Sequence, residues 1–136
     1  MLICIDSCAF IHAIQSSDPS ATKNFNLIGP ELGLVIPRLV AQEVTRNLDT
    51  PTEVKRFYQL FHGRDFARII DEPVPRALVE TYANLGLPAK ADAFIGAFAE
   101  WQQVDYLISD NRHFLRQLQT KAYEVMDADK FLGLIT

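Results

Sequence analysis

Cysteine is scarce in this sequence and long apolar runs are missing, and each shortage excludes a class of protein. Cys4 and Cys8 are the two cysteines, too few and too badly placed for a disulfide framework or a zinc site. We expect both to be free buried thiols, Cys4 on a strand and Cys8 in the first turn of the helix that follows. No run reaches the roughly 18 apolar residues of a membrane-spanning helix, so we expect no membrane association of that kind.

The sequence also lacks the motifs of several common enzyme classes. Its 6 glycines form no phosphate-cradling loop of either common type. It contains no nucleophile elbow, and His12, His62 and His113 do not have the spacing of metal ligands. We therefore expect the histidines to be surface or packing residues. His113 differs from the other two because it stands beside the acids described below.

Positive charge is in short supply as well. The formal net charge is −4, which argues against bulk attraction to nucleic acid or to an anionic membrane. It does not exclude a local site where a metal ion supplies the positive charge. The N-terminus has no basic segment before its apolar residues, and Asp6 interrupts these too early for a signal peptide. A cytoplasmic location is the expectation.

The chain has the length and composition of one globular domain. It has 136 residues, of which 49% are hydrophobic, enough for a sizeable core in a single domain over 1–136. Short apolar segments at 2–5, 33–37, 67–70, 106–109 and 123–126 have the pattern of strands. Helical patterns separate them at 7–15, 18–29, 38–48, 50–63, 75–86, 88–104 and 111–119, and a short C-terminal helix follows. This alternation predicts an α/β fold in which a five-stranded parallel sheet, with strand 2–5 central, lies between helices in three layers.

Acidic and polar residues follow several of the predicted strands. Sites in such folds form outside the carboxyl ends of the strands, near the point where the strand order reverses. Asp6 directly follows the first strand. Glu43 lies in the helix after the second strand, and Asp92 lies in the first turn of the helix before the fourth strand, and we expect both to project toward the same edge of the sheet. The other members of the set are Ser109, Asp110 and Asn111 after the fourth strand, and Asp127 and Asp129 after the fifth.

These acids have separate structural explanations and one collective explanation. Asp6 can cap a helix, Asp92 can complement a helix dipole, and Asp110 can form a turn with Asn111. Several carboxylates at one edge nevertheless repel one another, and a hard cation with oxygen ligands, Mg²⁺ or Mn²⁺, relieves that repulsion. A metal held there would orient a water and stabilise charge on a phosphoryl oxygen, which is the chemistry of phosphodiester hydrolysis.

Three segments, in order, resemble the PIN-domain family of metal-dependent ribonucleases, which includes the toxins of VapBC-type toxin–antitoxin pairs. They are "ICIDSCAFI", "IPRLVAQEVTRNL" and "KADAFIGAFAEWQQVDYLISDNRHF", and the resemblance spans the whole chain. The third is the most specific, with an aspartate opening an alanine-rich helix before a strand that ends in a hydroxyl residue and Asp or Asn. The resemblance implies a PIN-like domain with a five-stranded parallel sheet, an antitoxin partner, a homodimer and an RNA substrate.

The resemblance also implies roles for individual residues. Asp6, Glu43 and Asp92 match the three acidic metal-site positions of the family. The fourth position falls on Asn111 in the usual register, and on Asp110 if the register differs by one residue, so both stay open. Ser109 would be an orienting hydroxyl.

RNA contacts are harder to assign from sequence. Arg46 and Arg112 each stand near a predicted metal ligand and are candidates for holding a phosphate. Between Arg38 and Arg76 lie 7 of the 13 basic residues, Arg64 among them, but acids share that interval and a solvated helical surface explains it better.

Three functions compete for this pattern. The leading prediction is a Mg²⁺- or Mn²⁺-dependent endoribonuclease acting as the toxin of a toxin–antitoxin pair. A non-catalytic binding module with the same fold is the second. An aspartyl-phosphate phosphatase with Asp6 as nucleophile is the third, although that chemistry usually needs a second acid two residues on, where Cys8 stands.

Overall fold

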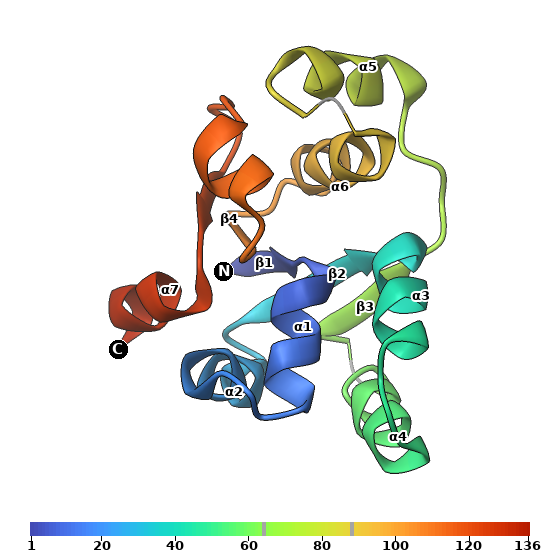
Figure 1. Ribbon diagram of the computed structural model, residues 1–136, viewed down its shortest axis with the longest axis vertical. Helices are drawn as coiled ribbons and strands as arrows, with labels where there is room; N and C mark the ends of the chain where they lie inside the picture. The colour runs from blue at the N-terminus through green and yellow to red at the C-terminus, as the bar shows by residue number, and fades with distance from the viewer. Residues whose placement is uncertain (64, 88) are drawn as a thin grey trace.

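A computed structural model describes residues 1–63, 65–87 and 89–136 (Figure 1). Its centre is one sheet in which every neighbouring pair of strands is parallel and β1 is central. The strand order is β3 (Ala67–Ile70), β2 (Gly33–Pro37), β1 (Leu2–Ile5), β4 (Tyr106–Ile108), β5 (Glu124–Met126). The predicted parallel five-stranded sheet with a central first strand is therefore confirmed.

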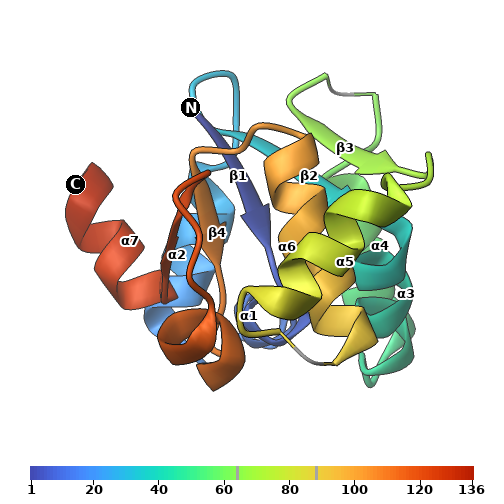
Figure 2. The ribbon, with the colours of Figure 1, turned by 90° about the horizontal axis from the view of Figure 1, so that it is seen from above.

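Helices connect the strands and cover both faces of the sheet. Helix α6 lies on one face with α5 outside it, while α1 to α4 lie on the other, and Figure 2 looks onto α5 and α6. Helix α7 packs against α2 beyond β5. The helices are α1 (Ser7–Ile14), α2 (Pro19–Leu27), α3 (Arg38–Arg46), α4 (Pro51–Gln59), α5 (Arg76–Asn84), α6 (Lys90–Trp101) and α7 (Ala128–Ile135), with a π-helical turn, η1, at His113–Gln117.

Several helix ends follow directly from the sequence. Asp18 caps α2 with Pro19 next to it, and Thr50 and Glu53 form a reciprocal capping box at α4. The predicted segments extend beyond the observed helices because they included caps and turns. The expected start of the α6 segment at Pro88, like Arg64, lies outside the described residues.

Apolar residues of the three central strands form the middle of the core, and Leu2, which the strand pattern also predicts to be buried, is the exception. In β1, Ile3, Cys4 and Ile5 are buried, and Leu2 is partly buried at the start of the strand. Val35 and Ile36 in β2, and Leu107 and Ile108 in β4, are buried as well. Across the described residues, no helix is both long and apolar enough to cross a membrane.

The expectation for the two cysteines is only half right. Both thiols are free, and Cys4 is buried, but Cys8 is exposed. In the first turns of α1, Ser7, Ala9 and Phe10 face the interior, so Cys8 is left on the outer side of the helix.

The strand order reverses between β1 and β4, and this places two predicted site segments beside each other. Strands β2 and β3 lie on one side of β1, and β4 and β5 lie on the other. Because Ile5 pairs with Ile108, the next residues along, Asp6 and Ser109, leave the sheet at the same level. The Asp6 backbone N–H donates to the Ile108 carbonyl at 2.9 Å, which fixes this register at the strand ends.

Candidate functional site

Asp6 lies at the centre of the candidate site. It is the N-cap of α1, and its Oδ1 accepts a hydrogen bond from the Ser7 backbone N–H at 2.7 Å. Its Oδ2 accepts from the Ser109 Oγ at 2.9 Å, across the β1–β4 boundary. Only 4% of Asp6 is exposed, so the capping role expected of it is real, but the cap is deeply buried.

Glu43 reaches Asp6 through a serine. The Ser7 Oγ donates to Glu43 Oε2 at 2.8 Å and lies 3.4 Å from Asp6 Oδ1. Glu43 is partly buried, near the middle of α3. Ser7 therefore holds the carboxylates of two predicted metal ligands on either side of one hydroxyl.

Asp92, in the first turn of α6, has two polar neighbours after β4. Its Oδ2 lies 3.0 Å from His113 Nδ1, and its Oδ1 is the acceptor of a long, 3.5 Å contact from Asn111 Nδ2. Asn111 is held in turn, because its Oδ1 accepts from the His113 backbone N–H at 2.9 Å. Asn111 and His113 therefore fix Asp92 from the β4 side of the site.

The electrostatics at Asp6 are those of a carboxylate without a countercharge. Burial raises the pKa of Asp6, the hydrogen bonds from Ser109 and Ser7 lower it, and the negative charges of Asp92 and Glu43 raise it again. Within the described chain, neither Lys nor Arg forms an ion pair with any of these three acids. The site is therefore short of positive charge.

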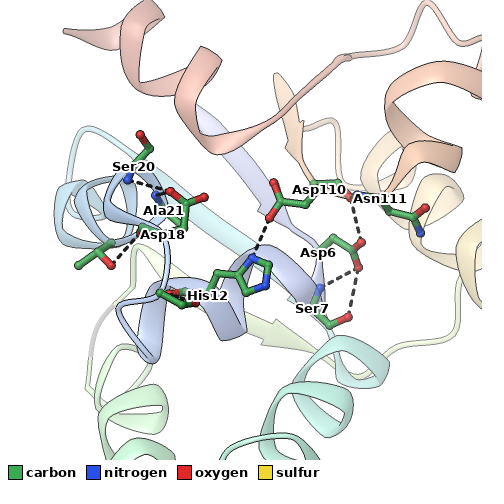
Figure 3. A network of polar contacts seen from close by, with 11 residues as sticks. Asp6, Ser7, His12, Asp18, Ser20, Ala21, Asp110 and Asn111 are labelled. Atoms are coloured by element: carbon green, nitrogen blue, oxygen red, sulfur yellow. Dashed lines mark hydrogen bonds and ion pairs between the residues drawn. The ribbon is translucent and has the colours of Figure 1, made fainter.

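Asp110 and Asn111 are adjacent, but their side chains point in different directions (Figure 3). Asn111 faces Asp92, whereas Asp110 Oδ2 lies 3.0 Å from His12 Nδ1 on α1. This divergence is the expected geometry where a strand ends. Asp110 thus has its closest polar contact outside the group around Asp6.

The donor chemistry of this group fits a hard divalent cation. Asp6, Glu43 and Asp92 offer carboxylate oxygens, the ligands that Mg²⁺ and Mn²⁺ prefer, and the uncompensated charge at buried Asp6 is what such an ion would neutralise. Their oxygens are not gathered as tightly as ligands around an ion. Among the described residues, a different group is gathered that tightly. It consists of His12, Asp18 and Asp110, which each offer one possible ligand atom within 4.8 Å of the other two.

The other predicted residues have no hydrogen bond or ion pair to Asp6, Glu43 or Asp92 among the described residues. Arg46 ends α3 and Arg112 precedes η1, and both are exposed. Asp127 and Asp129, which the sequence groups with the acids of the shared edge, have contacts elsewhere. Asp127 caps α7, and Asp129 accepts from the Ser20 Oγ.

Four polar residues of this region have contacts that sequence reasoning did not assign. Ser7 joins Asp6 to Glu43, His113 contacts Asp92, and His12 and Asp18 gather near Asp110. The one available signal was the position of His113 two residues after Asn111. Sequence spacing gives no comparable signal for His12 and Asp18, because tertiary contact brings them to Asp110.

Comparison with known proteins supports the fold. No protein-family model matches the chain, and no curated protein matches it either. Among solved structures, the chain resembles a chain in the crystal structure of VapBC2 from Rickettsia felis bound to a DNA fragment from their promoter. The TM-score is 0.63 at 17% identity, over 93% of this chain and 98% of the other. At this identity the likeness establishes a shared PIN-like three-layer fold.

Proposed function

We propose that this protein is a Mg²⁺- or Mn²⁺-dependent endoribonuclease whose metal ligands are Asp6, Glu43 and Asp92, with Asn111 at the fourth position. The observation that carries the proposal is the buried Asp6 carboxylate, which has no Lys or Arg partner among the described residues and lies where the strand order reverses. Glu43 and Asp92 are close enough to raise its pKa. An aspartate used only as a helix cap would not need two further acids beside it.

Each neighbour has a defined role in this proposal. Ser109 and the Ser7 backbone N–H orient the Asp6 carboxylate, and His113 holds Asp92. Asn111 donates from Nδ2 toward Asp92, while its Oδ1 accepts from the His113 backbone N–H. It would act at the metal through a bound water, or through Oδ1 if that oxygen turned toward the ion. When bound, the ion would polarise the phosphoryl group and lower the pKa of the attacking water. The exposed Arg46 and Arg112 would hold RNA phosphates.

We further propose that the chain is the toxin of a toxin–antitoxin pair and acts as a homodimer. The support is the resemblance of the three sequence segments, together with the fold shared with a chain of the VapBC2 complex. Expression of the chain in a bacterial host should arrest growth. Co-expression of the protein encoded immediately upstream should relieve the arrest, and sedimentation of the purified chain should give twice the monomer mass.

The central experiment is cleavage of a panel of labelled RNAs by purified protein in Mg²⁺, Mn²⁺, Ca²⁺ or EDTA. We expect cleavage in Mg²⁺ and Mn²⁺, little in Ca²⁺ because its looser geometry positions water less well, and none in EDTA. Asp6→Asn and Asp92→Asn should abolish cleavage. Asp71→Asn is the matched control, since Asp71 also directly follows a strand but is exposed and paired with Arg38.

The results also distinguish the alternatives. Mg²⁺ binding that depends on Asp6, without cleavage of any RNA, would point to the non-catalytic module. Cleavage by Asp6→Asn at the wild-type rate, after the variant has been purified free of other nucleases, would refute the proposed site. The phosphatase alternative is disfavoured because Cys8 stands where that chemistry usually places its second acid.

A further inference from the structure

A second group of metal-binding side chains lies beside the candidate nuclease site. His12 comes from α1, Asp18 from the N-cap of α2, and Asp110 from the turn after β4 (Figure 3). One ligand atom from each lies within 4.8 Å of the other two. They line an open surface hollow of about 440 Å³ together with Ser17 and Pro19.

We propose that His12, Asp18 and Asp110 form a binding site for a transition-metal ion of the Zn²⁺ type, separate from the acids around Asp6. An imidazole nitrogen with two carboxylate oxygens is a donor set suited to Zn²⁺, which accepts three protein ligands and one water. Mg²⁺ prefers oxygen ligands alone, so the histidine makes this site chemically different from the Asp6 group. The proposal does not depend on the nuclease activity.

The geometry of the two carboxylates supports metal binding. Asp18 Oδ1 accepts from the Ser20 and Ala21 backbone N–H groups, and Oδ2 has no hydrogen bond to any described residue. The α2 cap therefore fixes the orientation of Asp18 and leaves one oxygen available. Asp110 is turned away from Asp6, and its Oδ2 lies 3.0 Å from His12 Nδ1. A cation would replace that hydrogen bond with two ligand bonds.

Charge and accessibility are also favourable. In the part of the chain that the structure describes, no Lys or Arg pairs with Asp18 or Asp110, so two carboxylates face one histidine without a fixed positive charge. The His12 side chain is 45% exposed and that of Asp110 is 28% exposed. An ion from solvent can reach this group without opening the fold.

The test is calorimetric titration of the full, untagged, metal-free chain with Zn²⁺, together with the visible spectrum of the Co²⁺ complex. We expect one Zn²⁺ per chain. His12→Ala and Asp18→Asn should each weaken it by about 10- to 100-fold or more, because even outer-shell substitutions have effects of that size. His62→Ala is the matched control, since His62 is an exposed histidine elsewhere on the chain, and it should bind like wild type. The Co²⁺ spectrum should change with His12→Ala and stay unchanged with Asp6→Asn.

Other outcomes overturn the proposal. Zn²⁺ binding that survives His12→Ala but is lost in His113→Ala would place the ion at Asp92, and loss in Cys8→Ser would place it at that exposed thiol. If wild type and His12→Ala bind Zn²⁺ with the same affinity, the His12–Asp110 contact is only a hydrogen bond. Asp6→Asn tests the Mg²⁺ site and the nuclease activity, whereas His12→Ala tests the Zn²⁺ site. Failure of one proposal is therefore distinguishable from failure of the other.

Discussion

Ser109 donates a hydrogen bond from its Oγ to Asp6 Oδ2 at 2.9 Å, and this contact joins the ends of β1 and β4. The same Oγ accepts from the Asn111 backbone N–H at 3.0 Å. Ser109 is fully buried and Asp6 is 4% exposed, so the Asp6 carboxylate has little access to water if the hydroxyl is lost. One hydroxyl thus orients the central carboxylate and shapes the turn that carries Asn111.

Ser109→Ala should therefore destabilise the protein by about 1–3 kcal/mol, the usual effect of leaving buried hydrogen-bonding groups unsatisfied. It should also raise the pKa of Asp6 further, because a hydrogen bond to the charged form is lost. Urea unfolding measures the first effect, and Mg²⁺ titration of the folded variant should show weaker binding. Ser20→Ala is the matched control. Ser20 also donates to an aspartate at 2.9 Å, but in an exposed contact, and its loss should be nearly neutral.

The pKa of Asp6 predicts an unusual pH dependence of stability. Because the folded-state pKa is raised above 3.8, the unfolded chain loses this proton first as pH rises. In EDTA, wild type should therefore lose stability relative to Asp6→Asn from about pH 3.8 upward, until the pH passes the folded-state pKa. Asn is as good an N-cap as Asp, so the variant keeps the start of α1.

Unfolding curves at a series of pH values, with and without Mg²⁺, measure this difference. Mg²⁺ should stabilise wild type and leave Asp6→Asn unchanged, since a ligand that binds only the folded state raises its stability. A wild-type protein that is the more stable of the two in EDTA at neutral pH would contradict the account. It would mean that the hydrogen bonds from Ser7 and Ser109 outweigh the cost of burial.

The sheet was the most predictable part of this molecule. Strands β1, β2 and β3 begin and end at the predicted residues. The clearest of them, β2, is a short apolar run that begins at Gly33 and ends at Pro37. Alternation with helices then determined a parallel sheet, and with it the edge at which Asp6 and Ser109 meet. Hydrophobic pattern and chain connectivity, both readable from sequence, are the physical determinants here.

The directions of the side chains at that edge were less predictable. The sequence could not decide between Asp110 and Asn111, since the turn after β4 rather than residue type determines which one faces Asp92. His12 and Asp110 are 98 residues apart, and their contact depends on how α1 leaves β1. Cys8 is exposed for the same reason, because the rotation of α1 about its axis is determined by packing.

Two glycines in helices provide a paired test of the packing. A Cβ on Gly96 would lie 2.8 Å from Tyr82 Cδ2 and 2.8 Å from Leu87 Cδ1, and both of those side chains are fully buried. Gly96→Ala should destabilise the fold by about 1–3 kcal/mol through overpacking, less the roughly 1 kcal/mol that alanine adds as a helix former. A Cβ on Gly133 in α7 would meet no atom within 4 Å outside its own stretch of helix, so Gly133→Ala should stabilise the fold slightly. Thermal unfolding of both variants measures the difference, and equal shifts would mean that α5 and α6 pack loosely.

The proposed fourth metal-site position gives the last prediction, and the two adjacent residues there should behave differently. Asn111 contacts Asp92, so Asn111→Ala should strongly lower RNA cleavage at limiting Mg²⁺ and lower it less at saturating Mg²⁺. Asp110 points toward His12 and is partly exposed, so its loss should cost the nuclease site on the order of 1 kcal/mol or below. Cleavage by both variants should be measured across a Mg²⁺ titration in buffers freed of Zn²⁺, because Asp110→Ala also removes a ligand of the proposed second site. If Asp110→Ala is the inactive variant, the family register is shifted by one residue, and the Asp110 carboxylate must rotate from His12 toward Asp6 when the metal binds.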